Sequence, residues 1–537
     1  MFNTHGCLLV SGIRLSPDAD ASLAITEARR RLRGVRLLSE GMRLEIYKKS
    51  VDARDARALR LVYTVAARGA VPARLPEGCK GISLLSEEEP VPTFGSEPLS
   101  HRPVVVGSGP AGLFCALLLA ESGYRPILLE RGGSVAERRN AYRRLIENGV
   151  LDPETNVQFG AGGAGTFSDG KLVTRTRDPL GAYILKTFAR FGAPEEILTL
   201  AKPHVGTDIL GTVVENMLAE ILRLGGELHT HTKLLGIKTK SGKLLSVTTT
   251  RGEMPAGALV LAIGHSARDT YEMLLSLGFA IEAKAFSVGM RIEHLQADID
   301  KAMYGDYAGH PALGHAEYTL SSDTKTRGVY TFCMCPGGEV MAATSEEGGV
   351  AVNGMSYHAR DGRNANSAVL ATVFREDYGG TPRDAIALQR SIEQAAFAAG
   401  GGEYRAPIVT VGDFLARRAS AEPSRILPTY GEGRVRVASP DLYLPRVYTD
   451  AIRGALVRFG RTLRGFDTPD AVLTGAETRT SAPVRILRTD ERCALGYENI
   501  YPAGEGAGYA GGITSAAVDG VRTALALMQK YKPCGES

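Results

Sequence analysis

The sequence predicts an α/β fold: a Rossmann-type nucleotide-binding domain that carries an inserted mixed α+β domain and follows a small N-terminal α+β domain. Three observations support this prediction. A glycine-rich strand–helix–strand unit spans residues 102–131, a buried strand ends at Gly264, and a glycine–acid turn precedes a C-terminal helix. Because 537 residues exceed what one hydrophobic core accommodates, several domains are expected.

Residues 1–85 are predicted to form the N-terminal α+β domain. Its expected elements are a strand, a helix and two further strands, at residues 7–15, 21–33, 42–51 and 59–67. Residues 1–70 hold 13 Lys and Arg against 7 Asp and Glu. A solvated helix face is the favoured interpretation of the basic cluster, and RNA binding is the alternative. The cluster consists of Arg29, Arg30, Arg31, Arg33 and Arg36.

Residues 86–101 are predicted to be a linker, because prolines, glycine and an acidic run prevent a packed element there. The nucleotide-binding unit follows. Its strand at 104–106 leads into a G-x-G-x-x-G turn, an apolar helix at 110–121 and a second strand at 127–129. The glycines permit the tight turn, the approach of a pyrophosphate and close helix packing, and a terminal carboxylate suits ribose hydroxyls. The expected contacts are Gly107, Ser108, Gly109, Pro110, Ala111, Gly112, Glu130 and Arg131.

A second G-x-G-x-x-G occurs within residues 156–171, but no apolar helix follows it. Because that loop lacks a helix N-terminus to hold phosphate, it is predicted to close over a bound ring instead of forming a second dinucleotide site. The residues expected to contact the ring are Gly162, Gly163, Gly165 and Thr166. A β-meander at 234–252 and a buried strand ending at Gly264 complete this part of the domain, with His265 next to the cofactor.

The inserted domain is predicted at residues 281–465. It holds a strand GMRIEH, a hairpin formed by VYTFCMC and EVMAATS, and a helix from Thr381 to Ala399 with Pro382 at its first position. Cys333 and Cys335 are interpreted as packed thiols beside the hairpin turn, because their expected separation approaches the upper limit for a disulfide.

Candidates for substrate chemistry come from the same region. Arg291 and Arg363 are candidates to bind a carboxylate or phosphate, and His294 or His358 to move a proton. The alternative is a hydrated surface loop with structural histidines. The polar loop at 345–366 also contains Glu346, Asn353, Ser356, Arg360 and Asn366.

Residues 466–537 are predicted to return to the nucleotide-binding domain, whose first part spans residues 102–280. A third G-x-G-x-x-G ends at Gly511, and only 26 residues follow it. This is too short for another nucleotide-binding half with its own ribose acid, so the segment is expected to complete the first site.

Composition and cysteine spacing argue against several classes of protein. The 44% hydrophobic and 23% charged content is typical of a globular protein, and no apolar run reaches the roughly 18 residues needed to span a bilayer. No secretory signal is recognised, so the cytoplasm is the expected compartment. Seven scattered cysteines without a C-x-x-C pair argue against a disulfide framework or a disulfide reductase. His229 and His231 lack a third ligand, so no metal site is predicted.

The combination of these motifs resembles the two-dinucleotide-binding-domain flavoproteins, which implies FAD as cofactor. The resemblance assigns the first glycine turn and Glu130 to the ADP half and Gly504 and Glu505 to the ribityl chain, where the superfamily usually has Asp. Ile263 likewise replaces a usual threonine. Gly511, Gly512 and Ile513 would direct helix N–H groups at the flavin.

Longer strings extend the resemblance over nearly the whole chain. QFGAGGAGTFSDGKL, KPHVGTD, TFCMCPGGEVMAATSEEGG and AGEGAGYAGGITSAAVDG resemble a family of bacterial FAD-dependent dehydrogenases of unassigned substrate. The expected function is an FAD-dependent oxidoreductase acting on a small molecule by hydride transfer, with either NAD(P)H as a transient electron donor or another reductant in its place. Two alternatives stay open: a flavin enzyme that modifies nucleic acid through the basic first domain, and a non-catalytic FAD-binding sensor. The oligomeric state is not predicted.

Overall fold

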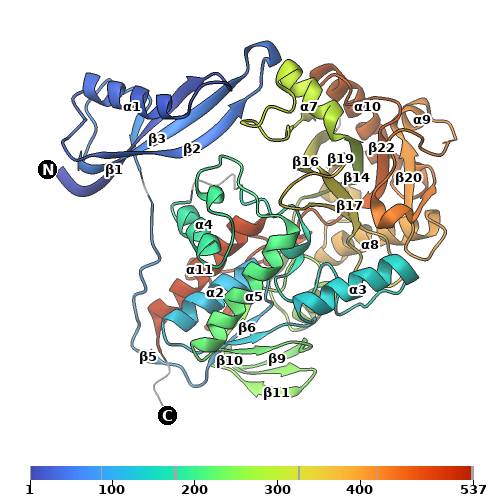
Figure 1. The fold of residues 1–537 in the computed structure, drawn as a ribbon. Coiled ribbons are helices and arrows are strands. Elements are labelled where there is room, and N and C mark those ends of the chain that lie inside the picture. The colour runs from blue at the N-terminus through green and yellow to red at the C-terminus, as the bar shows by residue number, and fades with distance from the viewer. Residues whose placement is uncertain (1, 86, 174–177, 324–326, 420, 534–537) are drawn as a thin grey trace.

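The computed structural model describes residues 2–85, 87–173, 178–323, 327–419 and 421–533. Figure 1 shows three regions: the N-terminal domain, a nucleotide-binding domain with helices α2 (Pro110–Glu121), α5 (Thr207–Arg223) and α11 (Ile513–Lys530), and an inserted domain built on a large sheet. Within these residues, no helix has the combined length and apolar character needed to cross a bilayer.

The N-terminal domain is a four-stranded antiparallel sheet in the order β2-β3-β1-β4, covered by one helix. The helix turns Ala24, Ala28 and Leu32 toward the sheet, as its periodicity predicts. The elements are β1 Phe2–Leu15, α1 Ser22–Gly34, β2 Arg43–Asp52, β3 Arg60–Pro72 and β4 Ile82–Leu84. In the basic cluster, Arg30 and Arg31 both pair with Glu27, which agrees with a solvated helix face.

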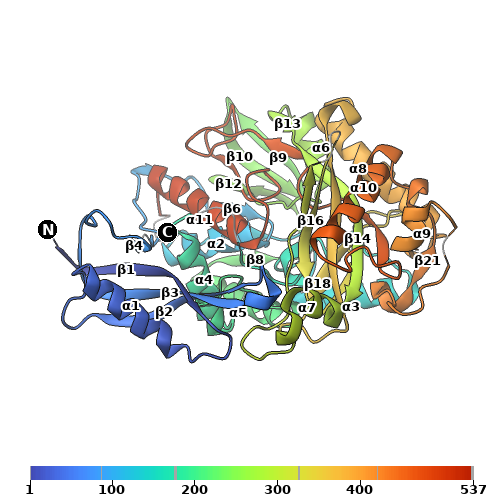
Figure 2. The same cartoon turned by 90° about the horizontal axis from the view of Figure 1, so that it is seen from above.

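The N-terminal domain also contacts the inserted domain. Seen from above in Figure 2, the sheet of the N-terminal domain reaches toward α7, Gln296–Tyr304. The Lys49 ammonium group donates a hydrogen bond to the Ala312 carbonyl at 2.7 Å.

The prediction that the linker forms no packed element is wrong at its end. Strand β5, Glu97–Pro98, pairs in parallel with β25, Tyr531–Lys532. The Gly95 amide donates to the Met528 carbonyl at 2.8 Å. A Cβ at Gly95 would lie 2.1 Å from the Lys530 carbonyl oxygen, so glycine permits this approach to the C-terminal helix.

The nucleotide-binding domain contains a five-stranded parallel sheet in the order β24-β12-β6-β7-β8. Val105 and Leu128 face the cluster formed with α2, α4, α5 and α11, while Val104 and Leu129 face the β-meander. The strands are β6 Pro103–Val106, β7 Ile127–Leu129, β8 Glu227–His229, β12 Ala258–Leu261 and β24 Ile500–Pro502, and the meander is β9 Leu234–Lys240, β10 Lys243–Thr249 and β11 Gly252–Pro255. The helices are α2 Pro110–Glu121, α3 Val135–Asn148, α4 Gly181–Arg190, α5 Thr207–Arg223, α6 Arg268–Ser276 and α11 Ile513–Lys530.

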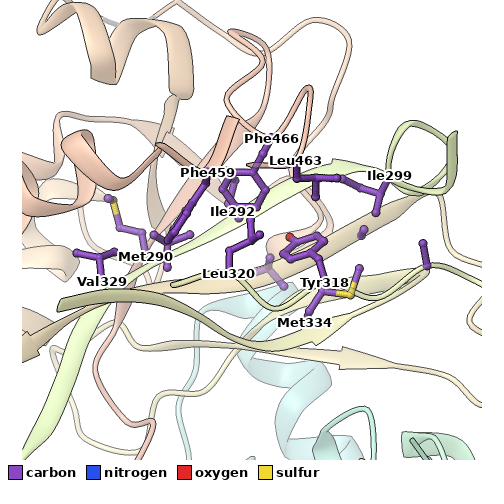
Figure 3. Packing of buried hydrophobic residues seen from close by; sticks show 14 of the residues in the cluster. Met290, Ile292, Ile299, Tyr318, Leu320, Val329, Met334, Phe459, Leu463 and Phe466 are labelled. Atoms are coloured by element: carbon purple, nitrogen blue, oxygen red, sulfur yellow. The ribbon is translucent and has the colours of Figure 1, made fainter. Parts of the chain in front are cut away.

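The inserted domain is a seven-stranded sheet in the order β15-β16-β19-β14-β22-β20-β21. Its strands are β14 Phe286–Leu295, β15 Ser321–Asp323, β16 Gly328–Cys335, β19 Asn364–Val373, β20 Ala406–Thr410, β21 Val435–Val437 and β22 Val472–Glu477. Its helices are α7 Gln296–Tyr304, α8 Pro382–Ala399, α9 Val411–Ala416 and α10 Arg446–Thr462. Thr381 caps α8 through a capping box, and Pro382 begins that helix as predicted. In Figure 3, Phe459 of α10 and Phe466 pack over Met290 and Ile292 of β14.

The predicted end of this domain at residue 465 is too early. Strand β22 pairs with both β14 and β20 inside the large sheet, so the inserted domain continues through Glu477. The chain returns to the nucleotide-binding domain at β23, Val484–Ile486, which pairs with β13, Ile281–Ala283. Sheet pairing between distant segments leaves no local signal, so the boundary could not be located from composition.

The predicted hairpin is also wrong. Strand β16 pairs with β15 and β19, whereas β17, Gly338–Ala342, pairs with β18, Val352–Ser356. The turn between β16 and β17 forms hydrogen bonds with other segments of the chain. The Gly337 amide donates to the Gln296 side chain at 2.8 Å, and the Gly337 carbonyl accepts from the Gly362 amide at 3.1 Å. Those bonds direct β17 away from β16.

Cys333 lies in a bulge of β16 with a φ of 46°, so Cys333 and Cys335 do not share one regular strand face. The described cysteines are all unpaired, and Cys534 lies outside the described residues. His231 falls beyond the end of β8 with a φ of 51°, so it does not share a strand face with His229. The described residues contain no group of three metal-ligating side chains.

Candidate functional site

A cavity of about 760 Å³ extends from the first glycine turn to the inserted domain. Most residues predicted to bind the cofactor line it: Gly107, Gly109, Pro110, Ala111, Glu130, Arg131, Gly163, Gly165, Gly264, His265, Glu505, Gly511, Gly512 and Ile513. Five predicted residues lie outside the lining: Ser108, Gly112, Gly162, Thr166 and Gly504. Its volume suits a cofactor or drug-sized ligand.

In the first glycine turn, backbone segments pack more closely than a side chain would allow. Gly107 has a φ of 96°, and a Cβ there would lie 2.3 Å from the carbonyl oxygen of Ala262, which directly follows the neighbouring strand β12. A Cβ at Gly112 would lie 1.8 Å from the Gly107 carbonyl oxygen. Gly109 forms the N-cap of α2, so the unbonded N–H groups of that helix start at the cavity wall. This cradle suits a pyrophosphate.

Glu130 is fixed at the cavity wall by backbone donors. Its carboxylate accepts hydrogen bonds from the Ser108 amide at 3.0 Å and hydroxyl at 2.6 Å, from the Gly132 amide at 3.0 Å and from the Gly160 amide at 2.9 Å. The carboxylate is therefore held at the end of β7 in one position. The neighbouring Arg131 guanidinium lies 4.0 Å from the Phe159 ring centroid.

The second glycine loop lies against the first, since a Cβ at Gly163 would be 2.9 Å from the Gly109 Cα. Arg138 holds this loop from behind. Its guanidinium donates to the carbonyls of Asn156 at 3.0 Å, Val157 at 2.7 Å and Ala161 at 2.6 Å. Burial lowers the pKa of Arg138 to about 9. Nothing in the sequence of α3 distinguished this arginine from the neighbouring Arg139.

The C-terminal turn presents an acid to the other part of the cavity. The Gly504 amide donates to the Asp519 carboxylate at 2.7 Å, and Arg488 and Arg492 also bind Asp519. These bonds fix the turn, so Glu505 faces the cavity. Burial raises the pKa of Glu505 to about 7.

Helix α11 begins directly after Gly512, and its first turn lines the cavity. Because the helix is 18 residues long, its positive end favours negative charge on a ligand there. His265 also lines the cavity, and burial lowers its pKa to about 3, so the imidazole is neutral. The glycine cradles, the fixed carboxylate of Glu130 and the helix N-termini together fit FAD.

None of the four residues predicted to perform substrate chemistry lines the cavity. Arg291 is fully buried and contacts Glu477 at 2.9 Å. His294 is buried and bonds the Phe466 carbonyl at 2.8 Å. His358 bonds the Val205 carbonyl at 3.1 Å, and Arg363 is exposed. These side chains are held by the protein or face solvent, so we assign them no contact with a ligand.

Sequence reasoning missed several side chains that do line the inserted-domain end of the cavity: Asp169, Lys171, Lys202, Glu317, Cys333, Glu477 and Arg479. Asp169 and Lys171 follow the second glycine loop, which was the one available signal. The others come from separate segments that meet only in the folded chain. Arg479 is held in a buried network in which Glu393 contacts Arg268 at 2.8 Å and Arg479 at 2.7 Å.

Comparisons with known proteins agree with this arrangement. Residues 285–480 match the family described as FAD-dependent protein, C-terminal domain-like, and residues 101–284 match the family of pyridine nucleotide-disulphide oxidoreductases. An uncharacterized protein of Clostridium beijerinckii is 43% identical over 529 residues, which are 97% of this chain and 98% of that protein.

Two solved structures resemble the chain more distantly. Glycine oxidase from Bacillus cereus is 10% identical with a TM-score of 0.34, over 81% of this chain and 99% of that one. The L-amino acid deaminase from Proteus vulgaris is 14% identical with a TM-score of 0.31, over 82% of this chain and 96% of that one.

Proposed function

From the premise that this chain belongs to the FAD-dependent protein family and is an FAD-dependent oxidoreductase, we propose that it transfers hydride between the flavin and a small molecule bound in the inserted-domain half of the cavity. The observation that carries the proposal is that one cavity joins the first glycine turn, Glu505 and the bulge of β16. A ligand in that cavity contacts both domains, which is a common position for a substrate site.

In this proposal, different residues of the cavity bind the ADP half and the flavin half of FAD. The first glycine turn and Glu130 would hold the ADP half of FAD, and the second glycine loop, Glu505 and the start of α11 would hold the flavin half. Bound FAD would supply the capacity to accept or donate a hydride. The positive end of α11 would stabilise negative charge that develops on the ring.

The inserted domain would exclude water from the reacting atoms. Tyr318, Phe332, Met334 and Val352 contribute apolar surface to the cavity wall. Arg479 is ion-paired to the buried Glu393, so its guanidinium keeps a fixed position at the same wall. An enclosed site of this kind strengthens electrostatic interactions with the substrate.

NAD(P)H would serve as a transient electron donor. The sequence has only one complete dinucleotide fingerprint, which FAD would occupy, so no separate nicotinamide site is expected. The nicotinamide ring would then enter the same cavity.

The test is a spectrum of the purified protein followed by anaerobic reduction. We expect a yellow protein whose extracted cofactor is FAD and whose flavin band is bleached by dithionite and by NADH or NADPH. A colourless, folded protein that refuses added FAD refutes cofactor binding. A bound flavin that none of these reductants bleaches refutes the oxidoreductase function and favours the sensor alternative.

A further inference from the structure

Five charged side chains gather at the inserted-domain end of the cavity. Asp169 and Lys171 follow the second glycine loop, Lys202 precedes α5, Glu317 precedes β15, and Arg360 follows β18. The first four line the cavity, and Arg360 lies behind them with a nearly buried side chain. This charge cluster plays no part in the FAD site described above.

Arg360 binds both carboxylates of the charge cluster. Its guanidinium binds Asp169 with two bonds, at 3.0 and 2.6 Å, and donates a third to Glu317 at 2.7 Å. Although burial opposes ionisation, Lys171 and Arg360 hold the pKa of both carboxyl groups below their ordinary values. Asp169 and Glu317 are therefore ionised at neutral pH.

The two lysines are left with free donors. The Lys171 ammonium is 3.7 Å from Asp169, and the Lys202 ammonium is 3.4 Å from Glu317, so both are ion contacts longer than a normal hydrogen bond. Among the described residues, neither ammonium group donates a hydrogen bond. His204 stands beside the cluster, and burial lowers its pKa, so it adds no charge at neutral pH.

The charges of these residues do not cancel. Lys171, Lys202 and Arg360 supply three positive charges, and Asp169 and Glu317 supply two negative ones. One excess positive charge remains at a cavity wall where two ammonium groups have unused donors. A ligand with one negative charge would satisfy both the charge and the donors.

The charge cluster also lies close to the flavin half of the cavity. Lys171, Cys333 and Glu505 all line this one cavity. A ligand held by Lys171 would extend along the cavity toward Glu505. This places its neighbouring atoms in the region where the proposed function requires the substrate.

We propose that the charge cluster is a subsite for the carboxylate of a small monocarboxylate substrate, with Lys171 and Lys202 as its donors. This proposal rests on the proposed function, because the bound carboxylate is a substrate only if the protein transfers hydride to or from it. Binding of a carboxylate at the charge cluster does not itself depend on hydride transfer. A dianion such as sulfate would leave an uncompensated negative charge in a partly buried place, which is costly.

The test measures binding of benzoate to the holoprotein by calorimetry and by the shift of the flavin absorption band. Benzamide is the neutral match for benzoate, and sodium sulfate supplies a dianion. We expect benzoate to bind and to shift the flavin band, and benzamide and sulfate to bind at least about tenfold more weakly. Lys171→Met should weaken benzoate binding by about tenfold, or about 1.4 kcal/mol.

Lys202→Met is the second variant, because its side chain is 55% exposed and its loss does not disturb the core. We expect a weakening of about threefold, since an exposed charge contributes less. Lys301→Met is the matched control: this lysine is 65% exposed on α7 and pairs with Asp306 away from the cavity. Its benzoate affinity should equal that of the wild type.

Three outcomes overturn the subsite: benzoate does not bind, benzamide binds as tightly as benzoate, or both lysine variants bind benzoate like the Lys301→Met control. Tighter binding of sulfate would overturn the monoanion assignment. If the protein contains no flavin, the proposed function fails, but calorimetry still measures benzoate binding. The two failures are therefore distinguishable.

Discussion

The close approach of Gly112 to the Gly107 carbonyl, directly behind the cavity wall, leads to a quantitative prediction for Gly112→Ala. The new Cβ would lie 1.8 Å from the Gly107 carbonyl oxygen and 3.3 Å from the Ala262 Cβ. A carbon and an oxygen normally stay more than about 3 Å apart, so the glycine turn must move away from α2 by about 1 Å or more. Overpacking of this kind costs about 1–3 kcal/mol.

If that strain falls on the cofactor cradle, FAD affinity drops by about 5- to 150-fold, because 1.4 kcal/mol corresponds to a factor of ten. The assay is a titration of apoprotein with FAD, followed by flavin absorbance, with circular dichroism to monitor folding. Gly181→Ala is the matched control: no atom lies within 4 Å of its new Cβ, and it starts α4 outside the cavity. Equal FAD affinity in the two variants would refute the assigned role of the glycine turn.

Two further predictions concern ionisable groups. Burial raises the pKa of Glu505 to about 7, so this group makes the apoprotein less stable as pH rises from about 5 to about 7. Glu505→Gln should flatten that decline in a melting-temperature series, and an unchanged series would contradict the assignment. Glu393→Gln should lower the free energy of unfolding by about 3–5 kcal/mol in urea, because it removes the carboxylate partner of the buried Arg479 and leaves the buried Arg268 with Glu346 alone. The exposed Glu347→Gln should have almost no effect, and equal losses in both variants would contradict this account.

The FAD-binding elements could be predicted because their signals are local in the sequence. Within thirty residues, the strand before Gly107, the helix after Gly109 and the acid at Glu130 each have a recognisable pattern, and all three form at the expected positions. The capping of α8 by Thr381 was equally local. Elements that depend on distant partners were not predictable: β16 pairs with β19 instead of β17, and β22 joins a sheet whose other strands lie far away in the chain.

The same difference between local and long-range signals distinguishes the cofactor end of the candidate site from its inserted-domain end. Arg291 was a reasonable candidate as an isolated cation, but Glu477 lies 186 residues away and neutralises it. Lys171 gave little signal in the sequence, yet the fold leaves it with free donors in a cavity, because Arg360 takes both nearby carboxylates.

A charged residue can bind a ligand only where the fold does not provide it with a full set of partners. The position of counter-charges in the folded chain, more than the residue type, therefore determines which cations remain available. In this protein that criterion argues against Arg291 and supports the proposed role of Lys171 and Lys202. It also explains why the cofactor could be inferred from motifs, while the chemistry of the substrate end became accessible only from the three-dimensional arrangement.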